Sequence, residues 1–374
     1  MKHDLTSALR RASALVRAGN PAGATEMIQS ALGATPVSAS QPSAQVEKLR
    51  AALPDMGHLG ARSGLRETLE KLVTAKPMHG LHGLRGAEPP EPVLPEGARF
   101  DRATFNCAQG SREYRVFVPK LATQRPAGMI MMLHGCTQSP VDFANGTDMN
   151  RVADENGLIV VYPAQSRGAN MQSCWNWFDA ADQHTGAGEP AILAALARQM
   201  QREHDVPEGR VFVAGLSAGA AMAVILGRTY PEVFAGVGAH SGLAYKAATD
   251  MPSAFAAMGG KLAPFDAARK HPVATIVFHG TADSTVHAAN GQRIADEARP
   301  NGVEVVQDGH SNGRSFTRSI IADGDMPSEH WRIAGLGHAW SGGKSTGSYA
   351  DPAGPDASGE MARFFLDLAP QGRE

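Results

Sequence analysis

Three segments of the chain carry the pattern Gly-x-Ser-x-Gly, in which glycines permit a sharp turn that presents a serine hydroxyl. They contain Ser217, Ser311 and Ser345. Only Ser217 follows an apolar, strand-like run (VFVA) and precedes an apolar, helix-like run (AAMAVIL). A serine on a turn between a strand and a helix can attack an ester carbonyl, so Ser217 is the predicted nucleophile. The alternative is a serine that only caps the helix.

The candidates for general base and orienting acid are His338 and Asp283. A serine hydroxyl needs a histidine to take its proton and a carboxylate to hold that histidine in the right tautomer. Where the three follow strands of one sheet, they often occur in the order Ser, Asp or Glu, His. Asp283 follows the run ATIVFHG and His338 follows HWRIAG, so both order and position fit. We expect His134, His240 and His279 to be structural.

Two backbone N–H groups are the candidates for an oxyanion hole. One donor normally comes from the residue after the nucleophile, and the other from a loop after an early strand. Here they are Ala218 and Cys136, the latter just after the apolar run MIMMLHG. A buried thiol or one half of a disulfide is the alternative interpretation of Cys136, and it is compatible because the donor is backbone.

Three tryptophans lie in the loops near these residues. Trp175 and Trp177 belong to the segment CWNWF, and Trp340 follows His338 by two positions. Aromatic walls suit an apolar acyl chain or a polyester strand, so we expect these rings to contact substrate. Ordinary core packing is the alternative, and it is the interpretation for Trp331 within its strand.

The sequence indicates no metal or organic cofactor. The segment GGKST resembles a phosphate loop, but His338 stands where the pattern G-x-x-x-x-G-K-[S/T] requires glycine. Cys107, Cys136 and Cys174 have no zinc-ligand spacing. One disulfide would leave one thiol over.

Composition excludes several classes of protein. The 374 residues hold 35 Lys and Arg against 37 Asp and Glu, and no long basic run, so a nucleic-acid partner is not expected. No apolar run is long enough for a membrane span. No export signal is visible, which predicts a cytoplasmic protein for the chain as given, or a secreted one if a leader was removed or export is non-standard.

From residue 99 onward, strand-like and helix-like segments alternate. The strand-like runs are 112–118, 129–135, 157–163, 210–215, 274–280 and 330–335, and the helix-like segments are 142–157, 189–205, 218–230, 290–298 and 358–368. This alternation predicts an α/β fold with a doubly wound, mostly parallel sheet over 99–374.

The first part of the chain has a different character. Leucine spacing predicts a helical extension over 1–75, and residues 76–98 are rich in Pro and Gly and read as a linker. A helical cap, an oligomerisation arm and a granule-binding arm remain open for it. A surface-packed extension is the favoured interpretation.

Several segments together resemble the polyhydroxybutyrate depolymerase-like esterases. They are LHGCTQ (133–138), QSRGANMQSCWNWF (165–178), GAGEPAIL (186–193), GLSAG (215–219), HGTADSTV (279–286) and GLGHAWSGG (335–343). The resemblance covers roughly residues 105–368. It implies an α/β-hydrolase fold, a Ser217–Asp283–His338 triad, oxyanion donors at Cys136 and Ala218, and tryptophan loops that contact polymer. It also implies a Cys136–Cys174 disulfide.

Three functions therefore compete. The first is a serine esterase that cleaves short-chain polyhydroxyalkanoate esters or their oligomers through an acyl-enzyme. The second keeps the mechanism but acts on feruloyl or acetylxylan esters. The third is a non-catalytic protein that associates with polymer or granules. Since the chain ends soon after His338, we expect no separate polymer-binding module, which favours amorphous polymer, oligomers or small esters. The oligomeric state stays open.

Overall fold

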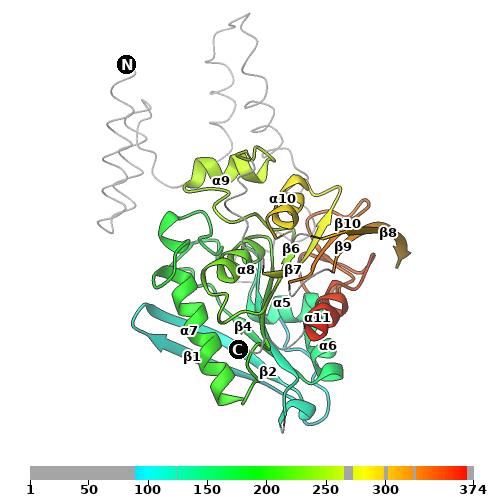
Figure 1. The fold of residues 1–374 in the computed structure, drawn as a ribbon. Coiled ribbons are helices and arrows are strands. Elements are labelled where there is room, and N and C mark those ends of the chain that lie inside the picture. The colour runs from blue at the N-terminus through cyan, green and yellow to red at the C-terminus, as the bar shows by residue number, and fades with distance from the viewer. Residues whose placement is uncertain (1–88, 124, 265–272, 299–301, 323–325, 369–374) are drawn as a thin grey trace, which may run out of the picture. The chain divides into compact units, whose positions relative to one another are not determined.

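The computed structural model describes residues 89–123, 125–264, 273–298, 302–322 and 326–368 (Figure 1). The predicted extension over 1–75, and the predicted linker as far as residue 88, lie outside the described residues. The described end of that linker, residues 89–98, carries neither helix nor strand before the first strand begins at Arg99.

Ten strands form one sheet within the described residues. They are β1 (Arg99–Cys107), β2 (Gly110–Val118), β3 (Gly128–Leu133), β4 (Leu158–Pro163), β5 (Val211–Leu216), β6 (Gly236–His240), β7 (Ala274–Gly280), β8 (Glu304–Ser311), β9 (Arg314–Ile321) and β10 (Ser328–Ile333). Their order is β1-β2-β4-β3-β5-β6-β7-β10-β9-β8. The six central strands run parallel, and an antiparallel pair flanks them on each side. The predicted doubly wound, mostly parallel sheet is confirmed.

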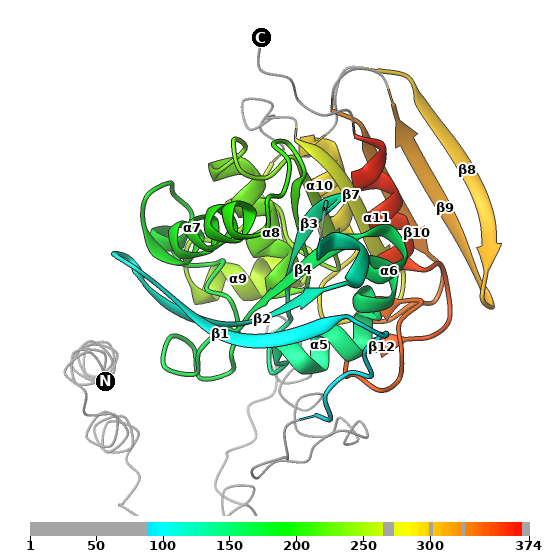
Figure 2. The same cartoon turned by 90° about the horizontal axis from the view of Figure 1, so that it is seen from below.

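Helices cover both faces of this sheet (Figures 1 and 2). Those on one face are α7 (Gly188–Glu203), α8 (Ala218–Thr229) and α10 (Ala289–Ala298), and those on the other are α5 (Pro140–Thr147), α6 (Met149–Asn156) and α11 (Ala357–Asp367). The short helices η1 (Lys120–Thr123), η2 (Ala180–Asp182) and α9 (Met251–Met258) lie in connections, and β11 (Trp340–Ser341) pairs with β12 (Ala350–Asp351). No helix in these described ranges is long and apolar enough to cross a membrane.

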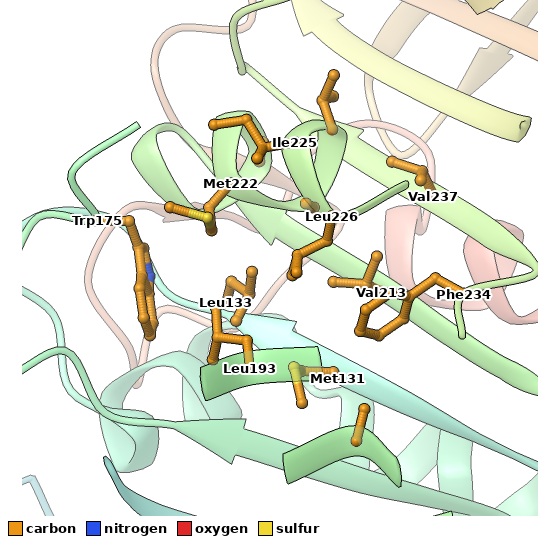
Figure 3. Packing of buried hydrophobic residues seen from close by; sticks show 14 of the residues in the cluster. Met131, Leu133, Trp175, Leu193, Val213, Met222, Ile225, Leu226, Phe234 and Val237 are labelled. Atoms are coloured by element: carbon orange, nitrogen blue, oxygen red, sulfur yellow. The ribbon is translucent and has the colours of Figure 1, made fainter. Parts of the chain in front are cut away.

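Side chains alternate between the two faces of each central strand, so the sheet has a separate hydrophobic core on each face. In β3, Met131 and Leu133 pack with α7 and α8, whereas Ile130 and Met132 pack with α5, α6 and α11. Figure 3 shows the first of these cores, in which Trp175 lies beside Met222 of α8. Apolar side chains on both faces of each central strand are thus buried, which is why those strands read as unbroken apolar runs.

Several features of the fold differ from the sequence-based prediction. The segment expected to be one helix over 142–157 forms two, α5 and α6, because Asp148 between them adopts a left-handed conformation with φ 55°. Strands β1 and β6 and the hairpin β8–β9 were not predicted. Nearly all of β8 is exposed at the edge of the sheet, so its sequence lacks the apolar alternation that marks a half-buried strand.

We predict that Phe212→Ala strongly destabilises the fold. The Phe212 ring on β5 is fully buried and stacks on Phe365 of α11 with the ring centroids 4.7 Å apart. Its removal loses apolar burial and leaves a cavity, so the free energy of unfolding should fall by about 3–5 kcal/mol in urea denaturation. The control is Phe255→Ala, since Phe255 on α9 is 65% exposed. Equal losses in the two variants would contradict this packing.

Candidate active site

Ser217 lies on the turn between β5 and α8, as predicted, and its backbone conformation is unusual. Its φ is 57° and its ψ is −119°, a combination that residues with a side chain rarely adopt. Such strain is concentrated at functional sites. The N–H of Ser217 donates to the carbonyl oxygen of His240, 2.9 Å away at the end of β6. The sheet therefore holds the turn and presents a half-buried serine at the carboxyl ends of the strands.

The two glycines of the motif are required because the backbone after β3 passes close to both. A Cβ on Gly215 would lie 2.6 Å from the carbonyl oxygen of Leu133, and a Cβ on Gly219 would lie 2.6 Å from that of His134. Any side chain there would push α8 away from β3. The pattern around Ser217 thus reflects close packing of strand, turn and helix.

Asp283 and His338 meet as the sequence predicted. Nδ1 of His338 lies 2.8 Å from Oδ2 of Asp283, and Oδ1 of Asp283 accepts the N–H groups of Thr285 and Val286 at 2.9 and 2.8 Å. Burial alone would raise the pKa of the Asp283 carboxyl, but the hydrogen bond and the charge of His338 outweigh it and the pKa lies below its usual value. The carboxylate is thus ionised and fixes the Nδ1–H tautomer of His338, which leaves Nε2 as the basic atom.

His240 joins the turn of Ser217 to the loop of His338. Its carbonyl accepts the N–H of Ser217, and its Nε2 accepts the N–H of Ser341, 3.1 Å away. Its ring is fully buried and stacks on Trp340, with the centroids 5.1 Å apart. Burial, followed by the nearby imidazoles of His279 and His338, lowers the pKa of His240 to about 3. The ring is therefore neutral at ordinary pH, with Nε2 free to accept.

The loop that carries Cys136 lies beside the serine. A Cβ on Gly135 would be 3.7 Å from Cβ of Ser217. Cys136 forms a disulfide with Cys174, as the resemblance implied, and the N–H of Thr137 donates to the carbonyl of Gln172 at 2.7 Å. Within the described part of the chain, no hydrogen bond occupies the backbone N–H of Cys136 or that of Ala218. Neither N–H thus has an acceptor within this part of the protein.

Buried hydrogen bonds around His134 also hold the loop of Cys136 in place. Nε1–H of Trp175 donates to the carbonyl of His134 at 3.0 Å, and Nε2 of His134 accepts the N–H of Gln165 at 3.1 Å. Since Nε2 accepts, Nδ1 carries the proton and donates to the carbonyl of Gly135 at 2.8 Å. Burial lowers the pKa of His134 to about 4, so this neutral tautomer persists. His134 thus has a structural role, as expected, and orients this loop.

Glu189, at the start of α7, was missed by the sequence reasoning. Its carboxylate is 4% exposed and accepts hydrogen bonds from Arg112 (3.2 Å), from the side chain of Gln165, and from the backbone and side chain of Asn176 (2.8 and 3.0 Å). Burial raises the pKa of Glu189, and these donors oppose that shift. The residue ties the segment 165–178 to the helix and, through Trp175, to the loop of Cys136.

A sequence model of the family described as "Esterase PHB depolymerase" matches residues 112–314. The chain belongs to this family. The match spans the serine turn and Asp283, and ends before His338.

Individual relatives agree with the family. The chain is 32% identical over 258 residues to "Poly(3-hydroxyalkanoate) depolymerase C" of Paucimonas lemoignei, covering 65% of this chain and 60% of the relative. It is 28% identical over 247 residues to "Poly(3-hydroxybutyrate) depolymerase" of Ralstonia pickettii, covering 60% and 50%. It is 36% identical over 135 residues to "Feruloyl esterase B" of Neurospora crassa, covering 36% and 44%. The chain thus spans about half the length of the curated relatives it matches.

A solved structure supports the fold. The acetyl xylan esterase from Aspergillus awamori superposes with a TM-score of 0.55 at 18% identity, covering 72% of this chain and all of that one. The α/β-hydrolase fold expected from the sequence is confirmed.

The three tryptophans expected to contact substrate are all buried in the structure. Trp175, Trp177 and Trp340 are 0%, 5% and 1% exposed. Their indoles pack in the two cores, and the N–H groups of Trp175 and Trp340 donate to His134 and Ser358. The expectation that these tryptophans contact substrate is therefore wrong. Their buried rings instead support the loops from the core. A sequence shows that a loop contains tryptophan but not which way the ring turns.

The described residues contain no group of three or more His, Cys, Asp or Glu side chains arranged to hold a metal ion. His279, whose ring is 1% exposed, has its Nε2 2.8 Å from the carbonyl of Val286 and 3.6 Å from Oδ2 of Asp283. It is the buried support that the sequence predicted.

We predict that His240 acts as a positioning residue. His240→Phe keeps a ring against Trp340 but leaves the Ser341 N–H without its acceptor, whereas His240→Gln keeps an acceptor. We expect His240→Phe to lower kcat on p-nitrophenyl butyrate by about 10–100-fold with little change in KM, because a buried unpaired donor costs about 1–3 kcal/mol and the His338 loop shifts to relieve it. His240→Gln should recover part of kcat. Equal kcat in both variants and the wild type would rule this role out.

Proposed function

We propose that the protein is a serine esterase that hydrolyses short-chain polyhydroxyalkanoate esters, as amorphous polymer or oligomers, through an acyl-enzyme. The observation that carries the proposal is the 2.8 Å hydrogen bond between Asp283 and His338. The loops that carry these two residues flank the strained turn of Ser217. In a member of this family, that constellation supports nucleophilic ester chemistry.

The reaction follows from the roles of these groups. Nε2 of His338 takes the proton of Ser217 as the serine oxygen attacks the ester carbonyl, and Asp283 stabilises the imidazolium. The backbone N–H groups of Cys136 and Ala218 donate to the oxyanion. His338 then returns the proton to the departing alcohol. Water repeats the sequence on the acyl-enzyme and releases the acid.

The substrate class rests on two kinds of support. Two relatives bear the names of poly(3-hydroxyalkanoate) and poly(3-hydroxybutyrate) depolymerases. A feruloyl or acetylxylan esterase is the second candidate, because "Feruloyl esterase B" and "Probable acetylxylan esterase A" also match the chain. Initial rates on methyl ferulate, acetylated xylan and hydroxybutyrate oligomers separate the two. A non-catalytic, granule-associated protein has no use for an Asp283–His338 pair, and labelling of Ser217 by a fluorophosphonate would exclude it.

The decisive experiment is the clearing of an amorphous polyhydroxybutyrate suspension. We expect the wild type to clear it and Ser217→Ala to lower kcat by roughly 10⁴-fold or more, because the nucleophile is lost while binding surfaces remain. Ser311→Ala is the matched control, since it alters a serine in another Gly-x-Ser-x-Gly segment, on the exposed hairpin β8–β9.

Two other results of the clearing experiment would change the proposal. Clearing by Ser217→Ala would refute the nucleophile. A wild type that leaves the suspension turbid but hydrolyses methyl ferulate would move the assignment to the second candidate.

We expect Asp283→Asn, which keeps the shape of the side chain, to lower kcat by about 10³–10⁴-fold. Its kcat should fall between those of the two serine variants.

The disulfide supports a location in an oxidising compartment or outside the cell, where such bonds form and persist. Cys107 is the one cysteine outside the bridge. Protein isolated from its native cells in the presence of a thiol-blocking reagent, then denatured, should therefore yield one blocked cysteine before reduction. Two further thiols should appear only after reduction. Three blocked cysteines without reduction would place the protein in a reducing compartment.

A further inference from the structure

An exposed aromatic side chain lies next to His338 and has no part in the mechanism above. Tyr349 is 40% exposed, and its ring meets the His338 imidazole edge to face, with centroids 6.3 Å apart and planes at 78°. Its hydroxyl lies 3.5 Å from Oγ1 of Thr137, which follows Cys136. The ring therefore spans the gap between the general base and the oxyanion loop, the two groups between which an ester must lie.

The backbone around Tyr349 holds the ring in this place. The carbonyl of Tyr349 accepts the N–H of Trp340 at 2.7 Å, and its φ of 50° is unusual for a residue with a large side chain. The preceding Ser348 donates its N–H to Asp142 at 2.9 Å and accepts from Nε2 of Gln138 at 3.0 Å. A strained conformation that neighbours over-determine is a mark of a functional position.

The same Gln138 also controls the oxyanion loop. Its Oε1 accepts the N–H of Gly135 at 2.9 Å, while its Nε2 donates to Ser348 and to Asp142. Gln138 is 5% exposed, so these bonds are shielded from water. The position of Tyr349 relative to the oxyanion donors is thus set by one buried amide.

The hydroxyl of Tyr349 has a proton to offer. Thr137 has a single hydroxyl proton, which it donates to the carbonyl of Cys136 at 2.6 Å. In the 3.5 Å contact Tyr349 must therefore be the donor, and at that length the bond is weak. A carbonyl oxygen of a bound molecule would be a better acceptor. The rest of the exposed ring offers apolar area beside it.

We propose that Tyr349 is a specificity-determining residue that binds the alcohol side of the ester. Its ring packs on the carbons next to the leaving oxygen, which His338 protonates, and its hydroxyl donates to a carbonyl further along the same chain. A 3-hydroxyacid ester has such a carbonyl, separated from the leaving oxygen by two carbons, whereas a simple alkyl ester has none. Tyr349 thus selects esters of hydroxy acids. This inference rests on the proposed esterase function.

Two matched substrates test the proposal. Methyl 3-(butyryloxy)butanoate and 2-pentyl butyrate have the same acyl group and a similarly branched alcohol, and the second carbonyl distinguishes them. We expect the wild type to prefer the first in kcat/KM. Tyr349→Phe should reduce that preference by about 3–10-fold, as expected for the loss of one hydrogen bond to a neutral carbonyl. Tyr349→Ala should also lower kcat/KM for 2-pentyl butyrate, because the ring is lost.

The preference ratio separates specificity from structure. Damage to His338 or to the oxyanion loop would slow both esters equally and leave the ratio unchanged. Tyr114→Phe, which removes a phenol hydroxyl on β2, three strands from β5, is the control and should keep the wild-type ratio. Circular dichroism confirms folding.

The outcomes distinguish this inference from the function on which it rests. If the wild type hydrolyses both esters and Tyr349→Phe keeps its ratio, the role of Tyr349 is refuted and the esterase stands. If the wild type hydrolyses neither ester, and Ser217 resists a fluorophosphonate, both proposals fall.

Discussion

The site depends on buried polar groups that keep their places only while their hydrogen bonds are made. His240 is the central case. Its carbonyl holds the N–H of Ser217, and its Nε2 holds the N–H of Ser341 three residues beyond His338. Burial keeps the ring neutral, and only a neutral ring can accept at Nε2. The low dielectric surroundings that suppress its charge also strengthen both bonds. The relative position of the serine turn and the histidine loop thus follows from one residue, whose backbone carbonyl binds the first and whose imidazole binds the second.

The loop of Cys136, where we propose one oxyanion donor, is held in the same way. His134, neutral for the same reason, accepts the N–H of Gln165 and donates to its own neighbour Gly135. Glu189 accepts hydrogen bonds from Gln165 and Asn176, which belong to the segment that carries Trp175. The Cys136–Cys174 disulfide links this segment to the loop of Cys136. Hydrogen-bond donors that are fixed before the reaction stabilise an oxyanion without reorganising, which is usually the largest single contribution to catalysis. The loop therefore requires a second segment of the chain and cannot be formed by β3 alone.

The positions of Ser217, Asp283 and His338 were easier to predict from the sequence than the groups that hold them. Ser217 stood out because apolar runs flank it, and Asp283 and His338 because they follow apolar strands in the expected order. Glu189 gave no such signal, since a glutamate at a helix start usually faces water, and only the fold brings Arg112 and Asn176 to it. The orientation of loop side chains has no period in the sequence, so buried and exposed aromatic residues could not be distinguished.

Buried and exposed aromatic residues have different roles in these loops. The buried indoles of Trp175 and Trp340 support the backbone, whereas the ring of Tyr349 is exposed and lies next to His338. Relatives named for hydroxyalkanoate, feruloyl and acetylxylan esters all match parts of this chain. A scaffold whose reacting groups are fixed by an interior network can accommodate such different esters if residues outside that network select them. Under the role proposed for Tyr349, substitution of its exposed side chain would change which ester is bound and leave the hydrogen bonds of His240 intact, whereas substitution of His240 would do the reverse.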